Sequence, residues 1–187
     1  MKMNLPNMLL ILRIALIPVF LALFVNIGPN DYFLRLTSIL VFLIAAFTDF
    51  LDGYLARRWN TVSNFGKLMD PLADKMLVSA AMIALAYRQE LAAWVVIVII
   101  CREFWVTSLR MLALEQGKTV IAASIWGKTK TVLQMAMLTV LIAGMGTNGF
   151  LGQWGNTIAM LLTYLSVIAT VFSAVEYTRD YKDVFKA

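Results

Sequence analysis

Charged residues are scarce in this sequence: they make up 14% of its 187 residues, whereas hydrophobic residues make up 61%. A soluble domain usually carries about 25% charged residues. The deficit argues against an ordinary soluble domain and places the chain in a lipid bilayer. The sequence also lacks low-complexity segments and recognisable linkers, so we expect residues 1–187 to form a single membrane domain.

Histidine is absent, and cysteine occurs only once, at Cys101. A single cysteine excludes an intramolecular disulfide and a cysteine metal cluster. The side chains that usually bind zinc or other softer metals are therefore missing or isolated. Carboxylates remain as candidate ligands, and they suit hard cations such as Mg²⁺ or Mn²⁺.

Six segments are apolar and long enough for membrane helices, each of which needs about 20 mostly apolar residues. They cover residues 7–26, 32–56, 67–88, 91–113, 129–146 and 153–178. None alternates apolar and polar residues as the strands of a membrane barrel do. Arg13 interrupts the first segment and no small-residue cleavage site follows it, so we expect a retained helix and not a signal peptide. We predict an all-α, polytopic membrane protein with six transmembrane helices.

The net charge is +5, and the basic residues gather on one side of the expected membrane. Only Arg35 and Arg88 belong to the odd-numbered loops and their edges. The even-numbered loops and the termini hold Lys2, Arg57, Arg58, Lys67, Lys118, Lys128, Lys130, Arg179, Lys182 and Lys186. By the positive-inside rule we expect both termini and the active site to face the cytoplasm, in the inner (cytoplasmic) membrane. This pattern favours anionic membrane lipid over nucleic acid as a partner.

Four aspartates flank the connection between the second and third segments. Asp49 and Asp52 are three residues apart, and Asp70 and Asp74 are four apart, so each pair shares a helix face. The short linker predicts antiparallel neighbouring helices whose carboxylates converge. Four negative charges at such short distances repel one another. Two divalent ions such as Mg²⁺ or Mn²⁺ would offset this repulsion and could hold the attacking and leaving oxygens of a displacement at phosphorus. Spacing alone leaves a cation path in a divalent-cation transporter as an alternative, although no second half of the chain repeats the motif.

Small residues accompany these acids. Gly53, Ala56 and Gly66 leave room for a flat group such as a nucleobase, and Arg57 can fork onto phosphate oxygens. The alternative is that the small residues only allow close helix packing.

The whole pattern is Asp49-x-x-Asp52-Gly53-x-x-Ala56-Arg57, eight further residues, then Gly66-x-x-x-Asp70-x-x-x-Asp74. It resembles the signature of the CDP-alcohol phosphatidyltransferase family. The resemblance implies that Asp49, Asp52, Asp70 and Asp74 lie at a metal site and that Asp74 is the general base.

The same resemblance implies that Gly53, Ala56 and Gly66 shape a cytidine pocket and that Arg57 contacts the diphosphate. It further implies a homodimer that uses CDP-diacylglycerol as donor and releases CMP.

The fourth and fifth segments hold the candidates for acceptor binding. Arg102 and Arg110 lie within an apolar run, where a charge costs about 2.5–3.5 kcal/mol and therefore requires a partner or a wet cavity. Lys128 and Lys130 follow near the same membrane side, although Lys128 alone is equally explained as a loop charge. A cluster of cations suits a phosphomonoester.

These segments, and the start Asn4-Leu-Pro-Asn7, resemble the bacterial members of the family that use glycerol 3-phosphate, which would then be the acceptor. Leu10 departs from that pattern, since relatives often have threonine there. We assign four residues to the acceptor phosphate: Arg102, Arg110, Lys128 and Lys130. The alternative acceptors are phosphatidylglycerol, inositol phosphate and serine.

Overall fold

The computed structural model describes residues 5–28, 31–58, 64–117, 125–144 and 152–182. Six helices and no strand are found in these residues. They are α1 (Leu5–Val25), α2 (Tyr32–Arg58), α3 (Asn64–Tyr87), α4 (Ala93–Glu115), α5 (Ile125–Gly144) and α6 (Gly152–Asp180). The prediction of an all-α chain is confirmed.

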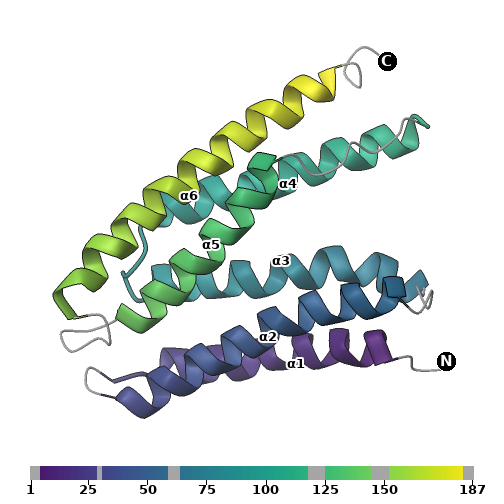
Figure 1. Cartoon of the computed structure of the whole chain (residues 1–187). Helices are drawn as coiled ribbons and strands as arrows, with labels where there is room; N and C mark the ends of the chain where they lie inside the picture. The colour runs from purple at the N-terminus through teal and green to yellow at the C-terminus, as the bar shows by residue number, and fades with distance from the viewer. Residues whose placement is uncertain (1–4, 29–30, 59–63, 118–124, 145–151, 183–187) are drawn as a thin grey trace.

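The helices form a bundle of two groups (Figure 1). In one group α1 packs against α2 and α3, and in the other α6 packs against α5 and α4. Contacts of α2 and α3 with α5, and of α3 with α4, join the two groups. The start of α1, the end of α2, the start of α3 and the end of α6 lie toward the same end of the bundle. The predicted acidic motif is carried by these ends of α2 and α3.

The main core combines large aromatic side chains with small residues. Phe20 lies fully buried between Phe24 and Phe42, with ring centroids 5.4 and 5.7 Å away. Ala45 and Ala81 are also fully buried and allow the helices to approach closely. A second, smaller core of Val106, Leu109, Ala113, Tyr177 and Tyr181 joins α4 to α6. This second core supports one wall of the site described below.

The outer surface is rich in apolar side chains. Phe33 is 77% exposed and Trp154 is 74% exposed. Two helices, with spans Met8–Val25 and Trp154–Asp180, are long and apolar enough to cross a membrane, and only 28% of each hydropathy window is buried. A soluble protein rarely exposes so much apolar surface, so these faces are suited to lipid. The helices α4 and α5 carry charges within their apolar runs, which lowers their hydropathy.

Arg88 joins the far ends of α3 and α1. Its guanidinium donates hydrogen bonds to the carbonyl oxygens of Val25 (3.1 Å) and Ile27 (3.0 Å) and lies 5.8 Å from the centre of the Phe24 ring. The last carbonyls of a helix have no partner within the helix. Arg88 therefore caps α1 from a neighbouring helix and fixes the two helices in register.

Candidate functional site

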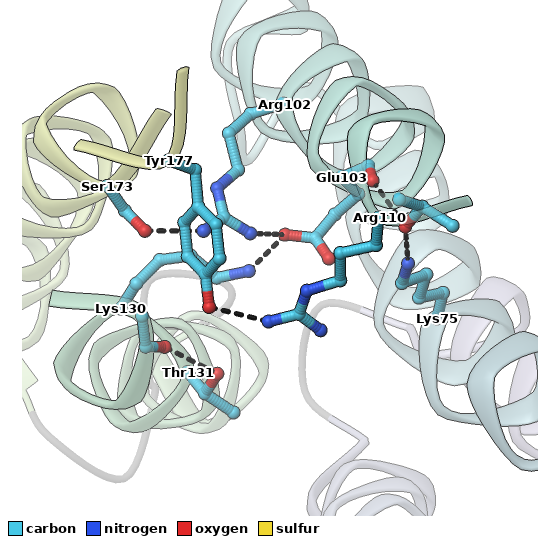
Figure 2. Close-up of polar contacts among 10 residues, drawn as sticks. Lys75, Arg102, Glu103, Arg110, Lys130, Thr131, Ser173 and Tyr177 are labelled. Atoms are coloured by element: carbon cyan, nitrogen blue, oxygen red, sulfur yellow. Dashed lines mark hydrogen bonds and ion pairs between the residues drawn. The ribbon is translucent and has the colours of Figure 1, made fainter. Parts of the chain in front are cut away.

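A cavity of about 180 Å³ lies between α3, α4, α5 and α6. Its lining is mostly polar or charged: Lys75, Arg102, Glu103, Val106, Thr107, Arg110, Gly127, Lys130, Thr131 and Tyr177. Figure 2 shows that the side chains from α4, α5 and α6 point toward one another around the Glu103 carboxylate. Among the described residues, four cations thus face a single carboxylate in this cavity.

Helical spacing explains how the sequence builds the walls. On α4, Glu103, Thr107 and Arg110 follow one another at steps of four and three and so share one face. On α5, Lys130 and Thr131 follow Gly127 by three and four residues, and on α6 Ser173 and Tyr177 are four residues apart. Each helix therefore presents one polar stripe to the cavity and an apolar face elsewhere.

Glu103 is the carboxylate at the centre of the cluster. It accepts a hydrogen bond from Arg102 Nη1 at 3.0 Å and forms an ion pair with Lys130 through the same oxygen. The side chains of Arg102 and Lys130 are only 9% and 6% exposed. Among the described residues, one carboxylate therefore faces these two cations together with Lys75 and Arg110, so the described lining carries an excess of positive charge.

Tyr177 organises the two arginines. Its hydroxyl oxygen accepts a hydrogen bond of 2.5 Å from Arg110 Nη2, and its ring centre lies 5.0 Å from Cζ of Arg110 and 5.6 Å from Cζ of Arg102. Arg102 also donates a hydrogen bond to the hydroxyl of Ser173. The tyrosine is 2% exposed, so this aromatic contact is sheltered from water and stronger than at a surface.

Lys75 brings the third helix to the cavity. Its ammonium group donates a hydrogen bond to the hydroxyl of Thr107, which in turn donates to the carbonyl oxygen of Glu103 at 2.7 Å. Among the described residues, neither Lys75 nor Arg110 has a carboxylate partner. Lys75 directly follows Asp74 in α3, so the backbone of the predicted general base lies beside this cavity.

The predicted acceptor residues divide into two groups. Arg102, Arg110 and Lys130 come together around one cavity, although no observation tests their role in binding. Lys128 is exposed and does not line this cavity. Two residues correspond to a rotation of about 200° around a helix, so Lys128 and Lys130 cannot share a face of α5. The explanation of Lys128 as an interfacial charge fits its exposure.

The other predicted site residues lie in described helices, but their side chains are outside the described part of the structure. Asp49, Asp52, Gly53, Ala56 and Arg57 belong to α2. Gly66, Asp70 and Asp74 belong to α3. The helical spacing on which the metal prediction depends is therefore present, whereas the predicted ligand set remains a prediction.

Sequence reasoning missed Tyr177 and Thr107 as parts of the cavity, and Ser173 as a hydrogen-bond partner of Arg102. A usable signal was present on α6, where Ser166, Thr170, Ser173 and Tyr177 recur at steps of four, three and four, and all are buried. Polar residues at helical spacing within an otherwise apolar span mark a face that packs against protein or lines a cavity. No comparable signal singled out Thr107.

A helical bundle with an apolar exterior and a cavity lined by cations is the architecture expected of a membrane protein that handles a charged substrate. The family model for CDP-alcohol phosphatidyltransferases matches residues 3–175, and the chain belongs to this family. It is therefore a transferase, and the resemblance drawn from the acidic motif is confirmed.

The relatives agree with one another in name. A protein of Bacillus subtilis (strain 168) is 45% identical over 150 residues, which cover 74% of this chain and 76% of the relative. A protein of Rickettsia bellii is 37% identical over 183 residues, which cover 97% of both chains. Both are named CDP-diacylglycerol–glycerol-3-phosphate 3-phosphatidyltransferase. A Mycobacterium tuberculosis protein, 34% identical over 97% of this chain and 83% of its own length, is named probable phosphatidylglycerophosphate synthase.

Proposed function

We propose that this protein transfers the phosphatidyl group of CDP-diacylglycerol to glycerol 3-phosphate, giving phosphatidylglycerophosphate and CMP in phospholipid biosynthesis. The observation that carries the proposal is the cavity in which four cations surround the one carboxylate of its described lining: Lys75, Arg102, Arg110 and Lys130. A phosphomonoester supplies the negative charge that this cavity lacks. The names of the relatives support the same donor and acceptor.

The acceptor phosphate binds on the Tyr177 side of the cavity. Arg110 has no carboxylate partner among the described residues, and the hydroxyl of Tyr177 holds its guanidinium in place. Arg102 and Lys130 already share Glu103, which limits their motion and keeps them directed at the cavity. Cations held in this way lose little side-chain freedom when phosphate binds, which favours affinity.

The reaction proceeds by displacement at phosphorus. Asp74 accepts the proton of the free hydroxyl of glycerol 3-phosphate, and that oxygen forms a bond to the phosphorus that bears the lipid. The bond between this phosphorus and the CMP oxygen breaks, and CMP leaves with the bonding electrons. In the donor site, Gly53, Ala56 and Gly66 leave space for cytidine and Arg57 binds the diphosphate.

A divalent metal site fits the residues of this chain. Asp49 and Asp52 on α2, with Asp70 and Asp74 on α3, offer carboxylate oxygens at helical spacing, in a sequence without histidine. Such a donor set suits two Mg²⁺ or Mn²⁺ ions. When bound, these ions neutralise negative charge on the diphosphate.

We further propose six membrane spans, with both termini and the active site facing the cytoplasm from the inner membrane, and a homodimeric assembly. The start of α1 and the end of α6 lie toward one end of the bundle, as an even number of spans requires. Cysteine labelling at Lys182 tests the orientation, and labelling only from the outside would contradict it.

Cross-linking of the purified protein in lipid tests the dimer, and a monomer at all concentrations would contradict it.

The proposed reaction is tested by CMP release from CDP-diacylglycerol by the purified protein with Mg²⁺ or Mn²⁺. The acceptors compared are glycerol 3-phosphate, serine, inositol phosphate and phosphatidylglycerol. Release that depends on glycerol 3-phosphate is the expected result. Release with another acceptor and none with glycerol 3-phosphate would assign the protein to a sibling activity.

A further inference from the structure

A second, smaller cavity of about 60 Å³ adjoins the cationic one. The two share Lys75, Glu103, Lys130 and Thr131. The small cavity adds the polar residues Ser79 from α3 and Gln134 from α5, together with the apolar side chains of Val78 and Met82. Gln134 follows Lys130 by four residues, and Ser79 follows Lys75 by four, which places both about 6 Å farther along their helices. The charged cavity therefore continues, one helical turn away, into a compartment lined by a neutral amide and a hydroxyl.

Gln134 is the unusual residue of this compartment. The residue is 4% exposed, and its buried Nε2 atom has no hydrogen-bond partner among the described residues. A buried amide donor without a partner is unfavourable. The amide lines the small cavity, so a molecule in that cavity is well placed to supply the missing acceptor.

We propose that the small cavity is the subsite for the C2 hydroxyl of the acceptor, and that Gln134 is the residue that recognises it. The inference rests on the proposed function, because the acceptor phosphate must occupy the adjoining cationic cavity. A hydroxyl oxygen accepts from the Gln134 amide, while Ser79 offers a second polar contact. With the phosphate and the C2 hydroxyl both held, the C1 hydroxyl is left free to react.

The size and charge of the compartment set its selectivity. A space of about 60 Å³ accommodates a hydroxyl and its carbon but neither a ring nor an acyl chain. A site built to bond a hydroxyl rejects an analogue that lacks it, because its own polar group then stays unpaired. Gln134 accordingly makes the protein selective for a polyol phosphate over a simple alkyl phosphate.

The test compares two acceptors that differ only at C2. Glycerol 3-phosphate carries the hydroxyl, and 3-hydroxypropyl phosphate lacks it, while both retain the phosphate and the terminal hydroxyl. With CDP-diacylglycerol as donor, the wild type should favour glycerol 3-phosphate in kcat/KM by roughly 5- to 150-fold. Gln134→Met, which is similar in size but cannot donate, should bring this ratio close to one. The same substitution at the exposed Gln116, which does not line either cavity, should leave the ratio as in the wild type.

The ratio separates recognition from a structural role. A substitution that only disturbs packing lowers kcat/KM for both acceptors together and leaves the ratio unchanged. If the Gln134→Met variant is active and its ratio of kcat/KM values equals that of the wild type, this inference is overturned while the proposed function stands. Equal use of both acceptors by the wild type would also overturn it, and this comparison needs no variant to fold. If the protein uses neither glycerol 3-phosphate nor 3-hydroxypropyl phosphate but does use another acceptor, the proposed function and the acceptor site are both overturned.

Discussion

Tyr177 holds Arg110 in two ways at once: its hydroxyl oxygen accepts a hydrogen bond of 2.5 Å from Nη2, and its ring centre lies 5.0 Å from Cζ of the same guanidinium. The tyrosine comes from α6 and the arginine from α4, 67 residues earlier in the chain. Their contact sets the position of a cation that has no carboxylate partner in the described part of the chain. Tyr177 is therefore expected to act on acceptor binding through Arg110.

Tyr177→Phe isolates the hydrogen bond, because it keeps the ring and removes only the hydroxyl. Loss of one such bond typically costs about 0.5–1.5 kcal/mol, or roughly 2- to 12-fold in affinity. We expect KM for glycerol 3-phosphate to rise by this factor, with little change in KM for CDP-diacylglycerol. Steady-state kinetics with each substrate varied in turn provide the measurement. Equal increases in both KM values would indicate a general disturbance of the fold and contradict this role.

Lys130 and Lys128 form a matched pair on α5. Lys130 is buried and lines the cavity, whereas Lys128 is exposed and does not. Lys130→Ala should weaken glycerol 3-phosphate binding by roughly 10- to 150-fold, as expected for loss of a charge-assisted contact of about 1.5–3 kcal/mol. Lys128→Ala should leave acceptor KM within experimental error. If Lys128→Ala has the larger effect, the assignment of the cavity to the acceptor phosphate is wrong.

Asp49, Asp52 and Asp70 should be required for transfer but not for folding. Asp49→Asn, Asp52→Asn and Asp70→Asn each remove a negative charge from the proposed metal site while keeping side-chain size. We expect CMP release to be lost in each variant, and excess chelator to abolish it in the wild type. Added Mg²⁺ or Mn²⁺ should restore only the chelated wild type. Full wild-type activity in excess chelator would contradict a metal-dependent reaction.

Arg88 is expected to matter for stability and not for chemistry. It lies at the far end of α3 and its partners are the carbonyl oxygens of Val25 and Ile27. Arg88→Met leaves these carbonyls without this donor, and we expect a loss of about 1–3 kcal/mol of stability. Thermal unfolding in detergent compares this variant with Arg179→Met, which changes an exposed arginine in the last turn of α6. Equal unfolding midpoints would show that the contact adds nothing to stability.

The sequence was sufficient to predict the helices because each contains a long, mostly apolar segment, although charges lower the hydropathy of α4 and α5. Their ends differ from prediction where polar residues extend a helix beyond its apolar part. The fifth segment was expected at 129–146, and α5 begins at Ile125, because Gly127 and Lys128 lower hydropathy without breaking backbone hydrogen bonds. Hydropathy reports which residues suit lipid, and helical hydrogen bonding continues past that boundary.

The candidate site was predictable only where a charge stood out against apolar neighbours. Arg102 and Arg110 were found in this way, and the structure places both at one cavity. Gln134, Thr107 and Tyr177 carry no charge, and their roles depend on which helices pack together. Spacing along one helix gives the face of a residue but not the residue opposite it, so these contacts required the structure.

The central claim is that the cationic cavity binds the phosphate of the acceptor, and Arg110→Ala tests it most directly. The measurement is KM for glycerol 3-phosphate and for CDP-diacylglycerol, determined side by side in wild type and variant. We predict a rise of roughly 10- to 150-fold in the acceptor KM, from loss of a charge-assisted contact of about 1.5–3 kcal/mol, and little change in the donor KM. An unchanged acceptor KM would contradict the account.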